Sequence, residues 1–80
     1  MRYGTETKLS TSEVLRKAEA YFGEGGLGLQ VTSHDECCIS LAGGGGQVTV
    51  SVREGDKTSV DVETQEWDYQ VKRFIADGLK

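Results

Sequence analysis

The chain has 80 residues, a formal net charge of −4 and no proline. This length suits one small domain, so we predict a single domain over residues 1–80. The negative charge disfavours binding to nucleic-acid phosphates and to anionic membranes. The N-terminal residues contain no apolar stretch typical of a secretory signal, and the two cysteines are too few for a disulfide framework. The sequence therefore predicts a cytoplasmic protein with reduced thiols.

The first elements are a strand and a helix. Weak alternation over residues 2–8 predicts the strand. Ser10 and Glu13 have the spacing of a capping box, in which each side chain accepts a hydrogen bond from the other residue's backbone N–H. The apolar spacing that follows predicts a helix over residues 12–22. Gly23 stands where a left-handed helix C-cap is expected.

Four segments with an apolar residue at every second position come next, at residues 27–31, 37–41, 48–52 and 60–62. Successive side chains of a strand point to opposite faces, so each segment is predicted to be a half-buried strand. Their close spacing predicts an antiparallel meander.

Facing residues must share one side of the sheet, which restricts the turns between these strands. Pairing Leu41 with Val48 leaves a glycine turn of two residues, 44–45, or of four residues, 43–46. Both turns require residues that tolerate positive φ, which glycine does, and both remain open.

The two other hairpins follow from the same rule. Pairing Val52 with Val60 leaves a three-residue loop, whereas a shorter turn would mix the two faces. Pairing Val31 with Cys37 leaves an odd-numbered loop centred on His34.

The last segment predicts a second helix over residues 66–77, with Thr64 as its N-cap. Trp67 and Phe74 fall on its apolar face, and Tyr69 falls on the opposite face. The simplest architecture for this order is an α+β fold of two layers. A strand, a helix, a four-stranded meander and a final helix would form an antiparallel sheet with both helices on one face.

This order resembles one half of the TATA-box-binding protein fold. Residues 20–29, 43–50 and 66–74 also resemble segments of small uncharacterised prokaryotic proteins with such a fold. The resemblance implies an architecture and carries no activity. The DNA-binding version of the fold uses a basic sheet face with apolar wedges. The outward positions here hold Arg53 as their only base, so we predict no nucleic-acid partner.

Cys37 and Cys38 are the most reactive-looking pair. Strand alternation places Cys37 in the core and Cys38 on the outer face, so the two thiols are not expected to hold one metal ion. His34, Asp35 and Cys38 could supply ligands, but one histidine and no paired cysteine spacing do not make a zinc site. We therefore predict no metal, no cofactor and no catalytic residue.

The outer sheet face and one helix stripe remain as candidate interaction surfaces. Short hydroxyl side chains on that face leave a flat surface that another subunit could approach. The leading hypothesis is a non-enzymatic interaction module that pairs with a second copy or another protein. One alternative is a small-ligand-binding or thiol-dependent protein that uses Cys38 and His34; a nucleic-acid module ranks third. The candidate interaction residues are Gln30, Thr32, Cys38, Ser40, Thr49, Ser51, Ser59, Tyr69, Lys72 and Arg73.

Overall fold

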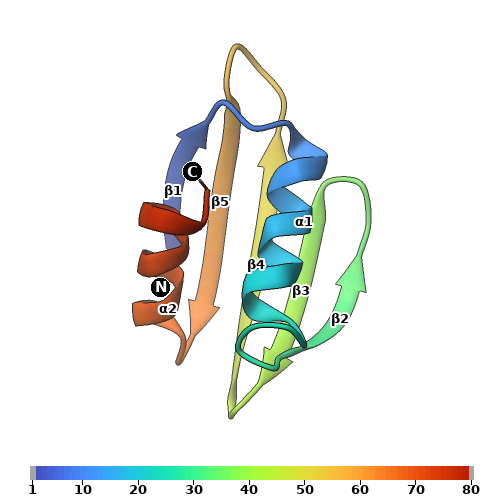
Figure 1. Ribbon diagram of the computed structural model, residues 1–80, viewed down its shortest axis with the longest axis vertical. Helices are drawn as coiled ribbons and strands as arrows, with labels where there is room; N and C mark the ends of the chain where they lie inside the picture. The colour runs from blue at the N-terminus through green and yellow to red at the C-terminus, as the bar shows by residue number, and fades with distance from the viewer. Residues whose placement is uncertain (1, 80) are drawn as a thin grey trace.

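The computed structural model describes residues 2–79 and shows an α+β protein (Figure 1). Its elements, in chain order, are β1 (Arg2–Thr7), α1 (Thr11–Phe22), β2 (Gln30–His34), β3 (Cys38–Gly43), β4 (Gly46–Arg53), β5 (Thr58–Gln65), α2 (Asp68–Arg73) and η1 (Phe74–Gly78), a π-helical turn that continues α2.

Within residues 2–79, five strands form one antiparallel sheet in the order β1-β5-β4-β3-β2. The helices α1 and α2 lie in front of this sheet in Figure 1, α1 over β3 and β4 and α2 over β5. The predicted α+β class with an antiparallel sheet is therefore confirmed. The opposite face of the sheet, which we call the outer face, has no helix over it in residues 2–79.

The core lies between the helices and the sheet. Most side chains predicted to point inward from β3, β4 and β5 are buried: Ile39, Leu41, Val48, Val50, Val60 and Val62. Val52, at the end of β4, is only partly buried. The rings of Tyr21, Phe22 and Phe74 contact one another, with centroids 5.0–5.4 Å apart, and join α1 to η1. One apolar cluster therefore links both helical elements to the sheet.

The β3–β4 hairpin closes through a two-residue turn. Leu41 pairs with Val48 as predicted, and the pairing continues to Gly43 and Gly46. Gly44 and Gly45 then form the turn with φ of 59° and 83°. Positive φ at both central residues is the requirement of a type I′ hairpin, which glycine meets without strain. The structure thus selects the shorter of the two possible turns.

The β4–β5 register is also the predicted one, with Val52 opposite Val60. The connection between the two strands covers residues 54–57, one residue more than expected. Side-chain parity thus located the pairing correctly, although the strand end was misplaced by one residue.

The start of α1 follows its local sequence. Ser10 is the N-cap: its hydroxyl accepts a hydrogen bond from the Glu13 N–H at 3.2 Å, and the Glu13 carboxylate accepts from the Ser10 N–H at 3.1 Å. These hydrogen bonds lower the pKa of Glu13, the backbone bond to Ser10 being the largest cause. The prediction of a left-handed cap at Gly23 is wrong, because Gly23 has an extended conformation with φ of −82° and ψ of −156°.

The start of α2 differs from the prediction. Thr64 is not an N-cap: it belongs to β5, is buried, and donates its hydroxyl to the Gln47 carbonyl at 2.8 Å. The chain leaves β5 at Glu66, which has a φ of 74°, and α2 begins at Asp68. Trp67 is half-buried and donates its indole N–H to the Gly43 carbonyl at 3.0 Å. The β5 ladder outcompetes the capping signal because it pairs Thr64 with Val48 of β4 and buries its side chain.

The edge strand β2 departs furthest from expectation. It begins at Gln30, so Leu27 lies in the preceding loop and is 37% exposed. Val31 pairs with Leu41 and not with Cys37, and a bulge shifts the register before Ser33. Val31 is 43% exposed although it shares the helix-facing side with Leu41. The helix α1 covers β3 and β4, so this edge has less apolar cover to fix its register.

Candidate functional site

The candidate interaction residues lie on two opposite sides of the molecule. Tyr69, Lys72 and Arg73 are exposed on α2, on the helix side. Thr32 lies at the β2 bulge, where its hydroxyl donates to the Ser40 carbonyl at 3.2 Å, and Ser33 takes the place opposite Ser40. The strand registers place the remaining candidates on the outer face: Gln30, Cys38, Ser40, Thr49, Ser51 and Ser59.

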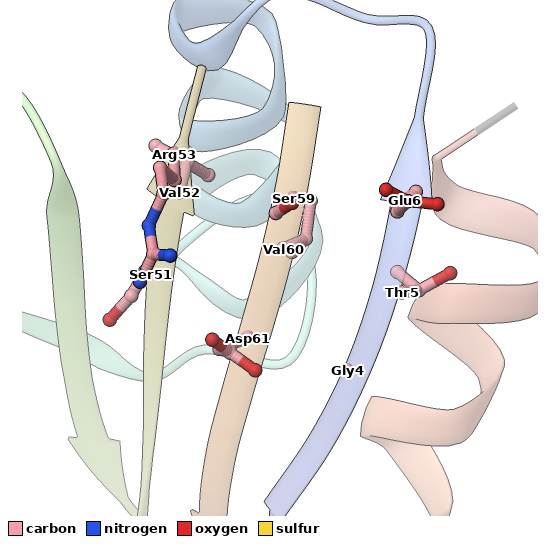
Figure 2. Close-up of a pocket in the computed structure, with 9 residues that line it drawn as sticks. All are labelled: Gly4, Thr5, Glu6, Ser51, Val52, Arg53, Ser59, Val60 and Asp61. Carbon is pink, nitrogen blue, oxygen red and sulfur yellow. The ribbon is translucent and has the colours of Figure 1, made fainter. Parts of the chain in front are cut away.

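The centre of the outer face carries short polar side chains. Ser40 and Thr49 share a hydrogen bond of 3.2 Å across β3 and β4. A hollow of about 550 Å³ lies on this face over β4, β5 and β1. Figure 2 shows the residues that line it. Gly4 contributes no side chain there, and it pairs with Asp61. Arg53 and Asp61 rise from neighbouring strands at this hollow, so the face combines hydroxyls with charges of both signs.

The cations of α2 already have partners within the chain. Arg73 donates to the Tyr69 hydroxyl at 3.2 Å, a bond that is the main cause raising the pKa of Arg73. The Lys72 ammonium lies 5.9 Å from the centre of the Tyr3 ring. Tyr3 in turn donates its hydroxyl to Asp68 at 2.9 Å; burial raises the pKa of Tyr3, and this bond raises it further. This stripe therefore couples α2 to β1 and is a weaker candidate for binding an acidic partner.

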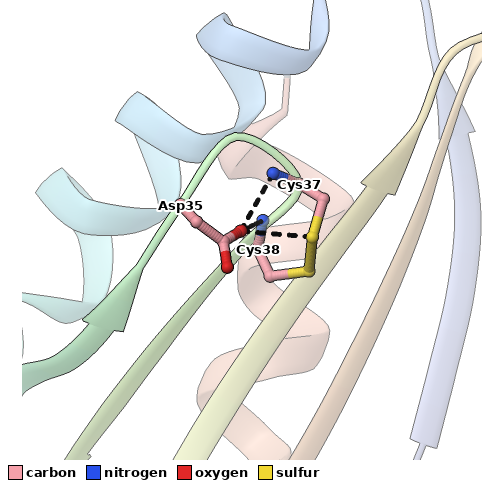
Figure 3. A group of neighbouring side chains, drawn as sticks. All are labelled: Asp35, Cys37 and Cys38. Carbon is pink, nitrogen blue, oxygen red and sulfur yellow. Dashed lines mark hydrogen bonds between the residues drawn. A yellow bond between two sulfur atoms is a disulfide. The ribbon is translucent and has the colours of Figure 1, made fainter.

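The two cysteines are not separated by the sheet. Their sulfur atoms are bonded to each other, as Figure 3 shows. The strand β3 begins at Cys38, and Cys37 precedes it as an exposed residue of the β2–β3 loop. The predictions that Cys37 is a core residue and that the thiols are reduced are both wrong for this structure. Alternation between faces does not apply to Cys37, because it lies in a turn.

Asp35 organises the turn that holds this pair. One carboxylate oxygen, Oδ1, accepts hydrogen bonds from the backbone N–H groups of Cys37 and Cys38, both at 3.1 Å. The Asp35 N–H donates to the Cys38 carbonyl at 2.9 Å. Aspartate is a common turn residue because its carboxylate bonds to the backbone two residues further on. That local signal could have revealed a turn at Cys37 from the sequence.

The β2–β3 loop and α1 enclose a groove of about 790 Å³ beside the cysteines. His34 lies opposite Ile39, on the helix-facing side of the sheet, with its Nδ1 3.5 Å from a carboxylate oxygen of Glu19. The sequence-based alternative grouped His34 with Cys38, whereas the groove is lined by His34 and Cys37. Its ionisable lining consists of the carboxylates of Glu19, Asp35, Glu36 and Glu54 with Arg16 and His34.

The same cluster has the donor types of a metal site. Ligand atoms of Asp35, Cys37 and Cys38 all lie within 4.8 Å of one another. Metal ions bind cysteine as the thiolate, and two sulfurs bonded to each other offer none. In the bonded state the cluster is thus a disulfide centre and not a metal centre.

No helix within residues 2–79 combines the length and apolar character required to cross a bilayer. The outer face and the groove with its sulfur pair are the two sites whose chemistry bears on function. No family model, curated protein or solved structure matches the chain.

Proposed function

We propose that this protein is a non-enzymatic interaction module that forms a homodimer through the outer face of its sheet. One observation carries the proposal: within residues 2–79, α1 and α2 pack on the same side, and the other side of the sheet has no covering layer (Figure 1). A second copy is the occupant that suits this surface best, for reasons of size and of hydrogen bonding.

The size of the face matches a stable interface. The molecule measures 36 × 22 × 19 Å along its principal axes, and Figure 1 views the sheet down the shortest of them. A face of 36 by 22 Å approaches the roughly 800 Å² that each partner buries in a standard-size interface. Nearly the whole face would have to take part, which favours sheet-on-sheet packing over a contact at one edge.

The hydrogen-bonding groups of the face complement those of a second copy. On β4, Thr49 and Ser51 present hydroxyl donors, and on β5, Glu63 and Asp61 present carboxylate acceptors in the paired positions. A two-fold axis parallel to the strands, running between β4 and β5, would set β4 of one copy over β5 of the other. The hydroxyls on β4 of each copy then face the carboxylates on β5 of the other copy. The same contacts form on both sides of the axis, as a self-complementary interface requires.

The resemblance to one half of the TATA-box-binding protein fold remains part of the proposal. The position of both helices on one side of an antiparallel sheet supports it. Binding of nucleic acid is not proposed, because the outer face sets Arg2 and Arg53 against Glu6, Asp61 and Glu63, and phosphate binding needs clustered cations. The cytoplasmic location stays a prediction from the sequence.

Sedimentation equilibrium across micromolar concentrations tests the dimer. We expect a reversible monomer–dimer equilibrium for the native chain. The Ser51→Glu variant should weaken association by at least about tenfold, because it sets a carboxylate against the Asp61 carboxylates at the centre of the interface.

The control places the same glutamate on the helix side. Ala20 is an exposed residue of α1, so Ala20→Glu should leave the association constant unchanged. A native chain that stays monomeric over the whole range would refute the proposal. Equal weakening by both variants would show that the interface is not the outer face.

A further inference from the structure

We infer that Cys37 and Cys38 form a reversible thiol–disulfide exchange site that reacts preferentially with cationic small thiols. The inference goes beyond the proposed dimer and does not depend on it. It rests on three observations: the bond joins adjacent residues, Cys37 is exposed, and the neighbouring groove is mainly acidic.

The bond between Cys37 and Cys38 is not a structural staple. A disulfide stabilises a fold mainly by restricting the unfolded chain, and the effect grows with the length of the enclosed loop. Here the sequence separation is one, so the bond encloses no intervening residue. The turn itself is held by the Asp35 carboxylate through hydrogen bonds to both cysteine N–H groups. Reduction can therefore occur without unfolding the core.

The two sulfurs are chemically unequal. Cys37 is exposed, whereas Cys38 is partly buried at the start of β3. The Cys37 sulfur also lies 3.2 Å from Oδ1 of Asp35. A negative charge at that distance disfavours a thiolate on Cys37 and favours a neutral thiol that donates its S–H to the carboxylate. Attack therefore occurs at the accessible Cys37 sulfur, and Cys38 is the leaving group.

The exchange proceeds in two balanced steps. The thiolate of a small thiol forms a bond to Sγ of Cys37 while the Cys37–Cys38 bond breaks. The electron pair of that bond leaves on Sγ of Cys38, which takes a proton from solvent. A second thiol then attacks the small-molecule sulfur of the mixed disulfide and releases Cys37. Two thiols are oxidised to one disulfide, and the cysteine pair gains two electrons and two protons.

The groove determines which thiols react fastest. Four carboxylates line it, those of Glu19, Asp35, Glu36 and Glu54, against the guanidinium of Arg16 and the imidazole of His34, which lies beside Glu19. This excess of negative charge raises the local concentration of a cation and lowers that of an anion. A cationic thiol should thus reach Cys37 faster than an anionic thiol of the same size.

The test follows reduction of the oxidised protein by cysteamine, 2-mercaptoethanol and 2-mercaptoethanesulfonate, with acid quenching and intact-mass detection. Each reduction rate is divided by the concentration of thiolate present, so that the three thiols are compared at equal amounts of the attacking species. We expect cysteamine to exceed mercaptoethanesulfonate by about tenfold at low salt, with the neutral thiol between them. The ratio should fall toward one in molar salt, which screens the groove.

Variants locate the effect. Glu36→Gln combined with Glu54→Gln should lower the cysteamine preference by about threefold. Glu66→Gln removes an exposed carboxylate beside Gly46, at the other end of β4 from the cysteines, and should not change it. Cys38→Ser leaves Cys37 as a free thiol, and treatment with cystamine should accumulate the cysteamine mixed disulfide on Cys37 with release of one cysteamine. Equal rates for the three thiols would overturn the charge selectivity. If the reduced protein does not regain the Cys37–Cys38 bond from excess cystamine, there is no exchange site.

Discussion

The β4–β5 hairpin and the β2–β3 hairpin have the same alternating pattern but behave differently. In β4 and β5 the inward side chains of Val48, Val50 and Val62 are completely buried, and the register is the one that side-chain parity predicts. In β2 the inward side chain of Val31 is 43% exposed, and a bulge interrupts the ladder.

The difference lies in what covers each strand. The helices α1 and α2 pack over the central strands, so a one-residue slip there would move buried valines into solvent. The edge strand β2 has little cover: its His34 lines the groove, and its Val31 lines a separate hollow of about 520 Å³. Alternation therefore fixes register only where another layer penalises the wrong face. The molecule combines a strictly specified centre with an edge that leaves polar and reactive groups accessible.

The largest expected difference in the free energy of unfolding is between substitutions of two leucines. Leu41 is completely buried in β3 and Leu27 is 37% exposed before β2. Leu41→Ala should lower the free energy of unfolding by about 2–5 kcal/mol, because it leaves a cavity in the core. Leu27→Ala should cost less than about 1 kcal/mol. Urea unfolding measures both, and equal losses would break the distinction between centre and edge.

Two glycines give the next comparison. A Cβ on Gly46 would overlap the backbone carbonyl of Gln65 in the central sheet, whereas a Cβ on Gly25, in the loop before β2, would contact nothing within 4 Å. Gly46→Ala should destabilise by more than about 1 kcal/mol, since backbone atoms of two strands must separate. Gly25→Ala should stay within about 0.5 kcal/mol of the native chain. Thermal unfolding of the two variants, side by side, decides the point.

The tip of the β3–β4 hairpin is tied to the start of α2 by one side-chain hydrogen bond, from the indole of Trp67 to the Gly43 carbonyl. Trp67→Phe keeps an aromatic ring but removes the donor, and should cost about 1 kcal/mol or somewhat more. Tyr69→Phe is the matched control: it removes the hydroxyl of a ring that is 65% exposed and should cost less than about 0.5 kcal/mol. A larger loss for Tyr69→Phe would contradict this assignment.

The smallest effect concerns the capping box of α1, the helix that borders the groove. Hydrogen bonds from Ser10 lower the pKa of Glu13 from its ordinary value of 4.5. A lowered pKa in the folded state stabilises the fold. This stabilisation is fully present at pH values above the ordinary pKa of 4.5 and is lost as the pH falls through the folded-state pKa. The native chain should therefore exceed Glu13→Gln in urea midpoint at neutral pH, and the difference should shrink in acid. A difference that grows in acid would reverse the sign of this linkage.

Local sequence determined the elements whose signals act over a few residues. The capping box of Ser10 and Glu13 starts α1, and the glycines at 44–45 supply the positive φ of the tight turn. Alternation also located the β3–β4 and β4–β5 registers, because each pairing is specified by buried side chains close together in the chain. Of the candidate sites, the hydroxyl-rich outer face followed from the same alternation.

Only the tertiary structure decided the rest. Thr64 had the chemistry of a helix cap, but its place beside β4 made it a buried strand residue. Cys37 had two conflicting local signals, the spacing of a core residue and the turn residue Asp35, and the structure shows that the turn prevails. His34 met Glu19 only because the β2 bulge turned it toward α1. For Thr64 and His34 the outcome depends on a distant element, β4 or α1, and a local pattern contains no information about that element.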